Sequence, residues 1–181
     1  MSAEGPKRPV LYWVICSAPP ALDWPRPLGL LHEAGQDVCV ILTPTAAAWL
    51  DIGQLEEATG HAVRTRPRLP TQQDELPPAD ALLVAPATFN TINKWAAGVS
   101  DTLALGLLNE LLGVGIPITV AVFCKSTLTT HPAYASNVQR LRTAGATVLE
   151  GNESIPTVDG GFSWEPLIAQ VIRSSGHGPN G

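Results

Sequence analysis

The stretch that decides the fold is residues 81–111, which read ALLVAPATFNTINKWAAGVSDTLALGLLNEL. Its first five residues are apolar and predict a short buried strand, which Pro86 should end because proline cannot donate to a strand ladder. After a turn of small and polar residues, apolar side chains recur at helical spacing. This spacing predicts one long amphipathic helix over residues 91–112, with Gly98 as a break or a point of close approach.

The turn between this strand and this helix, residues 86–91, has the composition of a ligand site. In an open parallel sheet, ligands bind where strands end and helices begin. Ala87 lets a flat ligand approach the backbone, and Thr88, Asn90 and Thr91 offer hydroxyls and an amide beside the N–H groups of the helix start. A structural role explains the same residues, since Thr88 or Asn90 can simply cap the helix.

The rest of the chain alternates apolar runs with helical segments. Further buried strands are predicted at residues 10–16, 38–42, 116–123 and 147–150, and a short edge strand at residues 61–65. Helices are predicted at residues 25–34, at 132–144 and from 164 to about 172, and a further helix is predicted to start at residues 46–50. This alternation implies parallel strands joined by right-handed crossovers. We therefore expect a three-layer α/β/α sandwich around a doubly wound, Rossmann-like parallel sheet of about six strands.

Length and composition limit the possible classes of protein. The chain has 181 residues, enough for one domain, which we expect over residues 9–173 between disordered tails at 1–8 and 174–181. A net charge of −5 gives no reason to expect a nucleic-acid or membrane-surface partner, and no apolar run reaches the roughly 18 residues of a membrane span. Cys16 and Cys39 lie in apolar runs and predict buried thiols, and the polar N-terminus lacks a secretory signal, so a cytoplasmic location is expected. The four histidines are scattered, and no metal site is predicted.

The deciding stretch resembles the signature of the homo-oligomeric flavin-containing cysteine decarboxylase family. This family includes phosphopantothenoylcysteine decarboxylases and enzymes that act on C-terminal peptidyl cysteine. Its signature reads roughly Pro-Ala-Ser-Ala-Asn-Thr, followed by a helix with Asn-Lys, then Gly and Asp. The corresponding residues here are Pro86-Ala87-Thr88-Phe89-Asn90-Thr91, Asn93-Lys94, Gly98 and Asp101. The resemblance extends over residues 10–172 and implies bound FMN and a homo-trimer or higher homo-oligomer, with the flavin near a subunit interface.

The resemblance also implies where FMN binds. Residues 16–18 stand in place of a Gly-Ser-Ile type turn that touches the FMN phosphate, and the second strand supplies further hydroxyls. The implied cofactor-binding residues are Ser17, Ala18, Thr43, Thr45, Pro86, Ala87, Thr88, Phe89, Asn90, Thr91 and Phe123. The first turn lacks a G-x-G-x-x-G pattern, which argues against a standard dinucleotide site. Ordinary polarity at strand ends would also explain Ser17 and Thr43.

A second family motif matches residues 122–132, and with it the resemblance implies the catalytic residues. Asn90 would hold the substrate or the flavin edge, Lys125, in place of a family Asn, would bind the substrate carboxylate, and His131 would assist as a substrate or proton-transfer group. The alternative for His131 is a helix start before Pro132. Cys124 would be a reactive thiol if Lys125 lowers its pKa, and otherwise a buried structural thiol.

Departures from the family pattern leave more than one function open. The family's catalytic His falls near Gln72 or Gln73 here, Thr129 takes the place of a Trp, and residues 151–163 lack the Cys of members that reduce their product. The leading hypothesis is oxidative decarboxylation of a cysteine-like thiol acid, small or peptidic, with an oxidised aminoenethiol product. The alternatives are an FMN-binding regulatory or partner subunit without this activity, and a flavin enzyme with another substrate. Five tryptophans lie either at subunit contacts or in the core.

Overall fold

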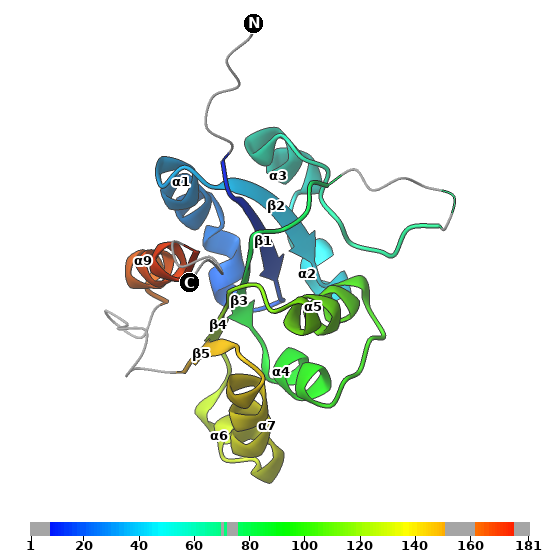
Figure 1. The fold of residues 1–181 in the computed structure, drawn as a ribbon, viewed down its shortest axis with the longest axis vertical. Coiled ribbons are helices and arrows are strands. Elements are labelled where there is room, and N and C mark those ends of the chain that lie inside the picture. The colour runs from blue at the N-terminus through cyan, green and yellow to red at the C-terminus, as the bar shows by residue number, and fades with distance from the viewer. Residues whose placement is uncertain (1–7, 70, 72–75, 151–161, 176–181) are drawn as a thin grey trace, which may run out of the picture.

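The computed structural model describes residues 8–69, 71, 76–150 and 162–175, which form a parallel sheet between two layers of helices (Figure 1). The sheet has five strands in the order β2-β1-β3-β4-β5, and every neighbouring pair is parallel. The strands are β1 (Val10–Ile15), β2 (Asp37–Leu42), β3 (Ala81–Ala87), β4 (Ile118–Val122) and β5 (Thr147–Leu149). The predicted three-layer, doubly wound fold is confirmed, with five strands in the described residues where about six were expected.

Two apolar cores lie on opposite faces of the sheet. One face is covered by α4 (Phe89–Ala96), α5 (Leu103–Val114) and α7 (Pro132–Thr143), and the other by α1 (Pro25–Glu33), α3 (Ile52–Thr59) and α9 (Trp164–Ser175). Alternate residues of β1 enter each core: Tyr12 packs in the first and Trp13 in the second. Burial on both faces explains why the strands read as unbroken apolar runs. The described residues also form three short helices: η1 (Pro19–Asp23), α2 (Pro44–Ala47) and α6 (Ser126–Thr129).

The prediction of a single helix over residues 91–112 is wrong, because the chain forms two helices, α4 and α5, with a break at Gly98. Gly98 has φ +74°, and its N–H bonds to Trp95 O at 2.8 Å, while Val99 N–H bonds to Lys94 O at 2.9 Å. This is the left-handed helix ending that glycine permits. Thr102 then starts α5 by accepting the N–H of Leu105 at 3.2 Å.

Pro86 does not end its strand, contrary to expectation. Strand β3 continues to Ala87, and its pairing with β4 shifts register between Val84 and Ala87. The register shift lets the ladder pass a residue that has no N–H to donate. The carbonyl of Pro86 is used instead, and accepts the N–H of Cys16 at 3.2 Å.

Other boundaries also differ from the sequence expectations. The edge strand expected at residues 61–65 is one bridge between Arg64 and Ile41. Where a helix was expected to start, at residues 46–50, the structure has the end of the short α2, and the separate helix α3 begins at Ile52. Helix α9 continues to Ser175, into the expected tail, and residues 176–181 lie outside the described part of the chain. None of the described helices is long and apolar enough to cross a bilayer.

Candidate functional site

The carboxyl ends of four strands meet at one edge of the sheet and bring most of the predicted site residues together. Three backbone hydrogen bonds join the ends: Cys16 N to Pro86 O at 3.2 Å, Thr43 N to Ile15 O at 3.1 Å and Phe123 N to Ala87 O at 2.8 Å. From β1 the chain goes to β2 on one side, while β3 lies on the other side, so a topological switch point lies between β1 and β3. In open sheets with this strand order, the crevice at the switch point is where ligands bind.

The turn of residues 86–91, which we call the elbow, is held by its own threonines. Thr88 caps α4 by accepting the N–H of Thr91 at 3.3 Å, and the two hydroxyl oxygens lie 3.1 Å apart. Thr91 is buried and its hydroxyl also lies 3.3 Å from the sulfur of Cys16. The capping alternative for Thr88 is therefore confirmed. Asn90, by contrast, is exposed at the first turn of α4, where its amide is free to meet a ligand.

The ends of β1 and β2 contribute two available hydroxyls, those of Ser17 and Thr45. Ser17 is half-buried, and within the described part of the chain its hydroxyl has no hydrogen-bond partner. Thr43 caps α2 by accepting the N–H of Ala46 at 3.4 Å, so its side chain has a structural role. Ala18 is buried at the start of η1, and Thr45 is exposed on α2. Ser17 and Thr45 are thus the polar side chains of these two turns that can bind a ligand, whereas Thr43 is used as a cap.

The turn after β4 and the start of α7 form the other wall of the site. Lys125 is exposed and precedes α6, and His131 caps α7 by accepting the N–H of Ala133 at its Nδ1, 3.1 Å away. Because Nδ1 is an acceptor, the neutral imidazole carries its proton on Nε2. The structural alternative for His131 is therefore confirmed, and the same contact makes Nε2 a hydrogen-bond donor. Phe123 is half-buried beside Phe162, with ring centroids 6.1 Å apart.

The idea that Lys125 activates Cys124 is wrong. Burial raises the pKa of Cys124, and the nearby carboxylate of Glu150 raises that pKa further. Both effects disfavour the thiolate, which is the nucleophilic form. Burial likewise raises the pKa of Cys16, and burial together with Asp37 raises the pKa of Cys39 to about 12. All three cysteines are free, and Cys16 and Cys39 are buried as predicted.

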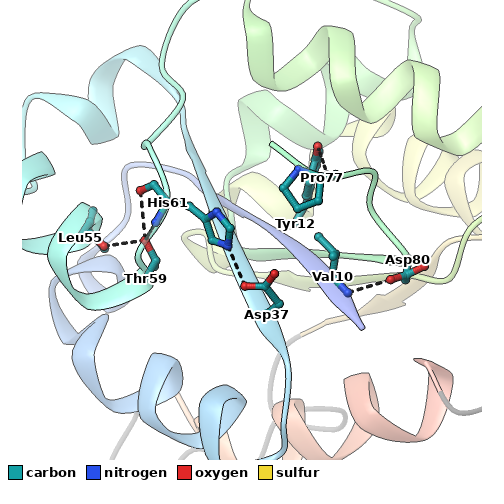
Figure 2. Close-up of polar contacts among 8 residues, drawn as sticks. All are labelled: Val10, Tyr12, Asp37, Leu55, Thr59, His61, Pro77 and Asp80. Carbon is teal, nitrogen blue, oxygen red and sulfur yellow. Dashed lines mark hydrogen bonds and ion pairs between the residues drawn. The ribbon is translucent and has the colours of Figure 1, made fainter. Parts of the chain in front are cut away.

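His61 cannot replace the histidine that the family pattern places near residue 72. Its Nε2 lies 2.7 Å from an oxygen of Asp37, the first residue of β2, so it is at the amino edge of the sheet, opposite the site (Figure 2). Further contacts hold the same edge: Tyr12 Oη donates to Pro77 O at 2.9 Å, and Val10 N donates to Asp80 Oδ2 at 2.8 Å. Gln72 and Gln73 lie outside the described residues.

Sequence reasoning missed Tyr134 and Glu150, which lie behind the site. Tyr134 is 3% exposed in the first turn of α7, and its ring stacks on Phe89 with centroids 6.0 Å apart and planes at 18°. Glu150, just after β5, lies near its hydroxyl, and that carboxylate raises the pKa of Tyr134. The sequence signal was faint: an aromatic residue three positions after His131 faces the same side of the helix.

The available donors at this edge suit an anionic, hydrogen-bonding ligand. They are the Ser17 and Thr45 hydroxyls, the Asn90 amide, the His131 Nε2–H and the Lys125 ammonium, together with the N-terminal N–H groups of the eight-residue α4. No group of three or more His, Cys, Asp or Glu side chains in the described residues could hold a metal ion. A nucleotide with a phosphate and a polar ring, such as FMN, fits this donor set.

Comparison with known proteins agrees with this geometry. The chain belongs to the flavoprotein family, whose model matches residues 7–176. A coenzyme A biosynthesis bifunctional protein CoaBC from Thermococcus kodakarensis is 31% identical over 153 residues, which cover 79% of this chain and 36% of that protein. The chain spans about a third of the length of the CoaBC relatives that it matches.

Solved structures share the fold over nearly the whole chain. The FMN-dependent cysteine decarboxylase SpaF has a TM-score of 0.74 and 24% identity, covering 93% of this chain and 97% of SpaF. The FMN-dependent cysteine decarboxylase TvaF from thioviridamide biosynthesis has a TM-score of 0.75 and 22% identity, covering 94% of this chain and 100% of TvaF. At these identities the likeness establishes the fold.

Proposed function

We propose that this chain is an FMN-dependent decarboxylase of a cysteine-like thiol acid, which is free, pantetheine-linked or at a peptide C-terminus. The supporting observation is that Asn90, Lys125 and His131 lie with Ser17 along one sheet edge, beside the β1–β3 switch point. FMN occupies that switch point in flavodoxin-like sheets of the same strand order. Related proteins of the family are named as FMN-dependent cysteine decarboxylases and as CoaBC, which supports the same reaction class.

Ser17, Asn90 and the N-terminus of α4 would hold the cofactor. The Ser17 hydroxyl and the backbone N–H groups of the helix start are suited to the phosphate, and the Asn90 amide to the polar edge of the flavin or to the substrate. Ala87 is fully buried in the core under α4, α5 and α7, so a flat ring would meet the elbow at the half-buried Thr88 and Phe89 and the exposed Asn90. Bound FMN would supply two-electron oxidation of the substrate's thiol-bearing carbon, after which the carboxylate leaves easily as CO₂.

Lys125 and His131 would orient the substrate. Lys125 is exposed and makes no ion pair with another described residue, so its ammonium is free to bind a carboxylate as a point charge. His131 would donate a hydrogen bond from Nε2, because Nδ1 is occupied by the N–H of Ala133. In this arrangement His131 positions an anion and does not act as a general base through Nδ1.

The proposed reaction is tested by mixing the FMN-loaded protein without oxygen with peptides that end in cysteine and with phosphopantothenoylcysteine. Bleaching of the flavin absorbance together with CO₂ release is the expected result for at least one substrate. Serine-terminated peptides serve as the control, because they keep the carboxylate and lack the thiol. A bound flavin that none of the thiol acids reduces would contradict the proposal.

The second candidate is an FMN-binding regulatory or partner subunit without decarboxylase activity. Substitutions on the substrate side favour it: Lys125 and Thr129 replace an Asn and a Trp of the motif, and the Thr129 hydroxyl bonds to Ser126 O at 2.7 Å. This candidate predicts the same flavin affinity and no reduction by thiol acids, so the anaerobic experiment separates the two.

We also propose that the chain forms a homo-trimer or a higher homo-oligomer in the cytoplasm. A groove of about 770 Å³ lies between α5 and residues 64–69 and 76–79, and its lining includes Leu69 and Val114, which are 66% and 65% exposed. Exposed apolar linings of this kind are typical of interaction surfaces. Trp13, Trp95 and Trp164 are core residues, whereas Trp49 is exposed and available for a contact. Sedimentation equilibrium tests the trimer, and a monomer at micromolar concentration would contradict it.

A further inference from the structure

Helices α4 and α7 lie side by side and meet at three levels, each about one helical turn apart. At the level nearest the site, the ring of Phe89 stacks on the ring of Tyr134. One turn on, Asn137 Nδ2 donates to Asn93 Oδ1 at 2.7 Å. A further turn on, Arg140 donates to the carbonyl of Ala96 at 3.3 Å. The three contacts align the helices, but only the first of them touches proposed site residues.

The first contact joins the two walls of the proposed site. Phe89 belongs to the elbow, between the cap Thr88 and the exposed Asn90. One face of its ring stacks on Tyr134, and the ring meets His131 edge to face, with centroids 5.7 Å apart and planes at 78°. Phe89 therefore contacts both the cap of α7 and the aromatic residue three positions later.

Tyr134 is itself fixed from the side of β5. Its hydroxyl is close enough to Glu150 for that carboxylate to raise the pKa of Tyr134. The Glu150 carboxylate lies 2.9 Å from Arg142 Nη2, and the same nitrogen donates to Val148 O at 2.7 Å. Tyr134 is almost fully buried, so its ring has little freedom to reorient. Burial and the Glu150 carboxylate raise the pKa of Tyr134 above its ordinary value, and the phenol remains a hydrogen-bond donor.

We propose that Tyr134 is a positioning residue that holds Phe89 against His131. It thereby fixes the position of the elbow, which would bind the flavin, relative to the start of α7, which would bind the substrate. The inference rests on the proposed function, because the two walls matter only if cofactor and substrate bind there. Tyr134 acts through Phe89 and touches neither ligand. The alternative is that Tyr134 only stabilises the packing of α7 on α4, as Asn137 does.

Three variants separate these two roles. Y134M keeps a large apolar side chain and removes the ring, Y134F keeps the ring and removes the hydroxyl, and N137A breaks the next contact along the same helices. Two readouts are used for each: the dissociation constant for FMN from flavin fluorescence, and the ¹⁵N shifts of the His131 ring without FMN. The His131 signal is assigned by its loss in H131N.

Positioning predicts that Y134M weakens FMN binding by about three- to tenfold, the size expected for one aromatic contact. Its His131 ring should lose the single Nε2–H tautomer and average between both forms. Y134F and N137A should keep that tautomer and bind FMN within about twofold of the wild type, even where N137A lowers the Tm as much as Y134M does.

The proposal is overturned if Y134M behaves like N137A in both readouts, or if Y134F is as impaired as Y134M. If Y134M does not fold, F89L removes the same stack from its half-buried side and should reproduce the change at His131. A wild-type protein that binds no FMN would overturn the proposed function alone, because the His131 tautomer still decides the role of Tyr134.

Discussion

The sulfur of Cys16 lies 3.3 Å from the hydroxyl oxygen of Thr91, which connects the end of β1 to the first turn of α4. The same hydroxyl lies 3.1 Å from that of Thr88, the cap of α4. The buried thiol thus adds a side-chain contact across the switch point to the backbone hydrogen bond from Cys16 N to Pro86 O. The family resemblance implies a glycine at the position of Cys16, so this contact is a feature of the present chain.

Replacing Cys16 by alanine should lower the free energy of unfolding by about 1–2 kcal/mol, because a buried hydrogen bond and some packing are lost. It should also weaken FMN binding, since Thr91 loses a contact that orders the elbow. Urea unfolding and FMN titration check the two effects. Cys39→Ala is the control: Cys39 is equally buried but lies in β2 away from the elbow, so stability should fall and FMN affinity should not. An unchanged FMN affinity in C16A would contradict this account.

Replacing Gly98 or Gly106 by alanine should have opposite effects on the stability of the fold. Gly98→Ala should destabilise the fold by about 1 kcal/mol or more, because the left-handed conformation at φ +74° disfavours a side chain. Gly106→Ala should stabilise it by up to about 1 kcal/mol, because Gly106 lies inside α5 and a Cβ there meets nothing within 4 Å. Thermal unfolding of both variants measures the difference. A stabilising Gly98→Ala would contradict the helix break.

Two substitutions of His131 should separate its role as a helix cap from its proposed role in substrate binding. Asparagine is a good helix cap, so His131→Asn should unfold within about 0.5 kcal/mol of the wild type, whereas His131→Ala should lose about 1 kcal/mol. Both variants lack the Nε2–H donor, and both should lower kcat/KM for a thiol acid by about tenfold, as expected for one hydrogen bond to a charged group. Full activity in His131→Asn would show that His131 is a cap alone.

Lys125 should affect substrate binding and leave the fold unchanged. Lys125→Ala should raise the KM of thiol acids by about tenfold, the value for one charge-assisted contact, while the Tm stays within about 1 °C because the side chain is exposed. Lys94→Ala is the control, since its ammonium pairs with Asp101 outside the site and its KM should not change. An unchanged KM in Lys125→Ala would remove Lys125 from the proposed site.

The thiol of Cys124 should be slow to alkylate at neutral pH. Because burial and Glu150 raise its pKa, the thiolate fraction is smaller than in free cysteine at pH 8, and the rate should rise as pH increases toward the raised pKa. Glu150→Gln should speed the reaction, while Glu110→Gln on α5 should have no effect. Iodoacetamide labelling followed by mass spectrometry measures the rates. Labelling at pH 7 as fast as free cysteine would restore the reactive-thiol hypothesis.

The sheet was predictable because each strand is buried on both faces, which leaves an unbroken apolar run such as that of β1. The division of residues 91–112 into α4 and α5 was harder to predict, because apolar residues keep helical spacing on both sides of Gly98. The positive φ of Gly98 in the structure shows that the helix breaks there. Helix α3 was missed because Leu55 is its one fully buried residue, too weak a pattern to recognise.

The site was predictable as far as local chemistry and resemblance reach. The elbow, Lys125 and His131 were placed from sequence, and the structure brings them to one edge. Which hydroxyls are already occupied by capping, as in Thr43 and Thr88, depends on backbone geometry and could not be read from composition. Tyr134 depends on contacts with distant segments, which no local pattern encodes.

The central claim is that FMN binds at the carboxyl edge beside the β1–β3 switch point, and a crystal structure of the protein grown with FMN tests it most directly. We predict one flavin per chain, in contact with Ser17 and Asn90 and with its ring against the elbow. A crevice filled by side chains, with FMN absent or bound elsewhere on the molecule, would contradict the account.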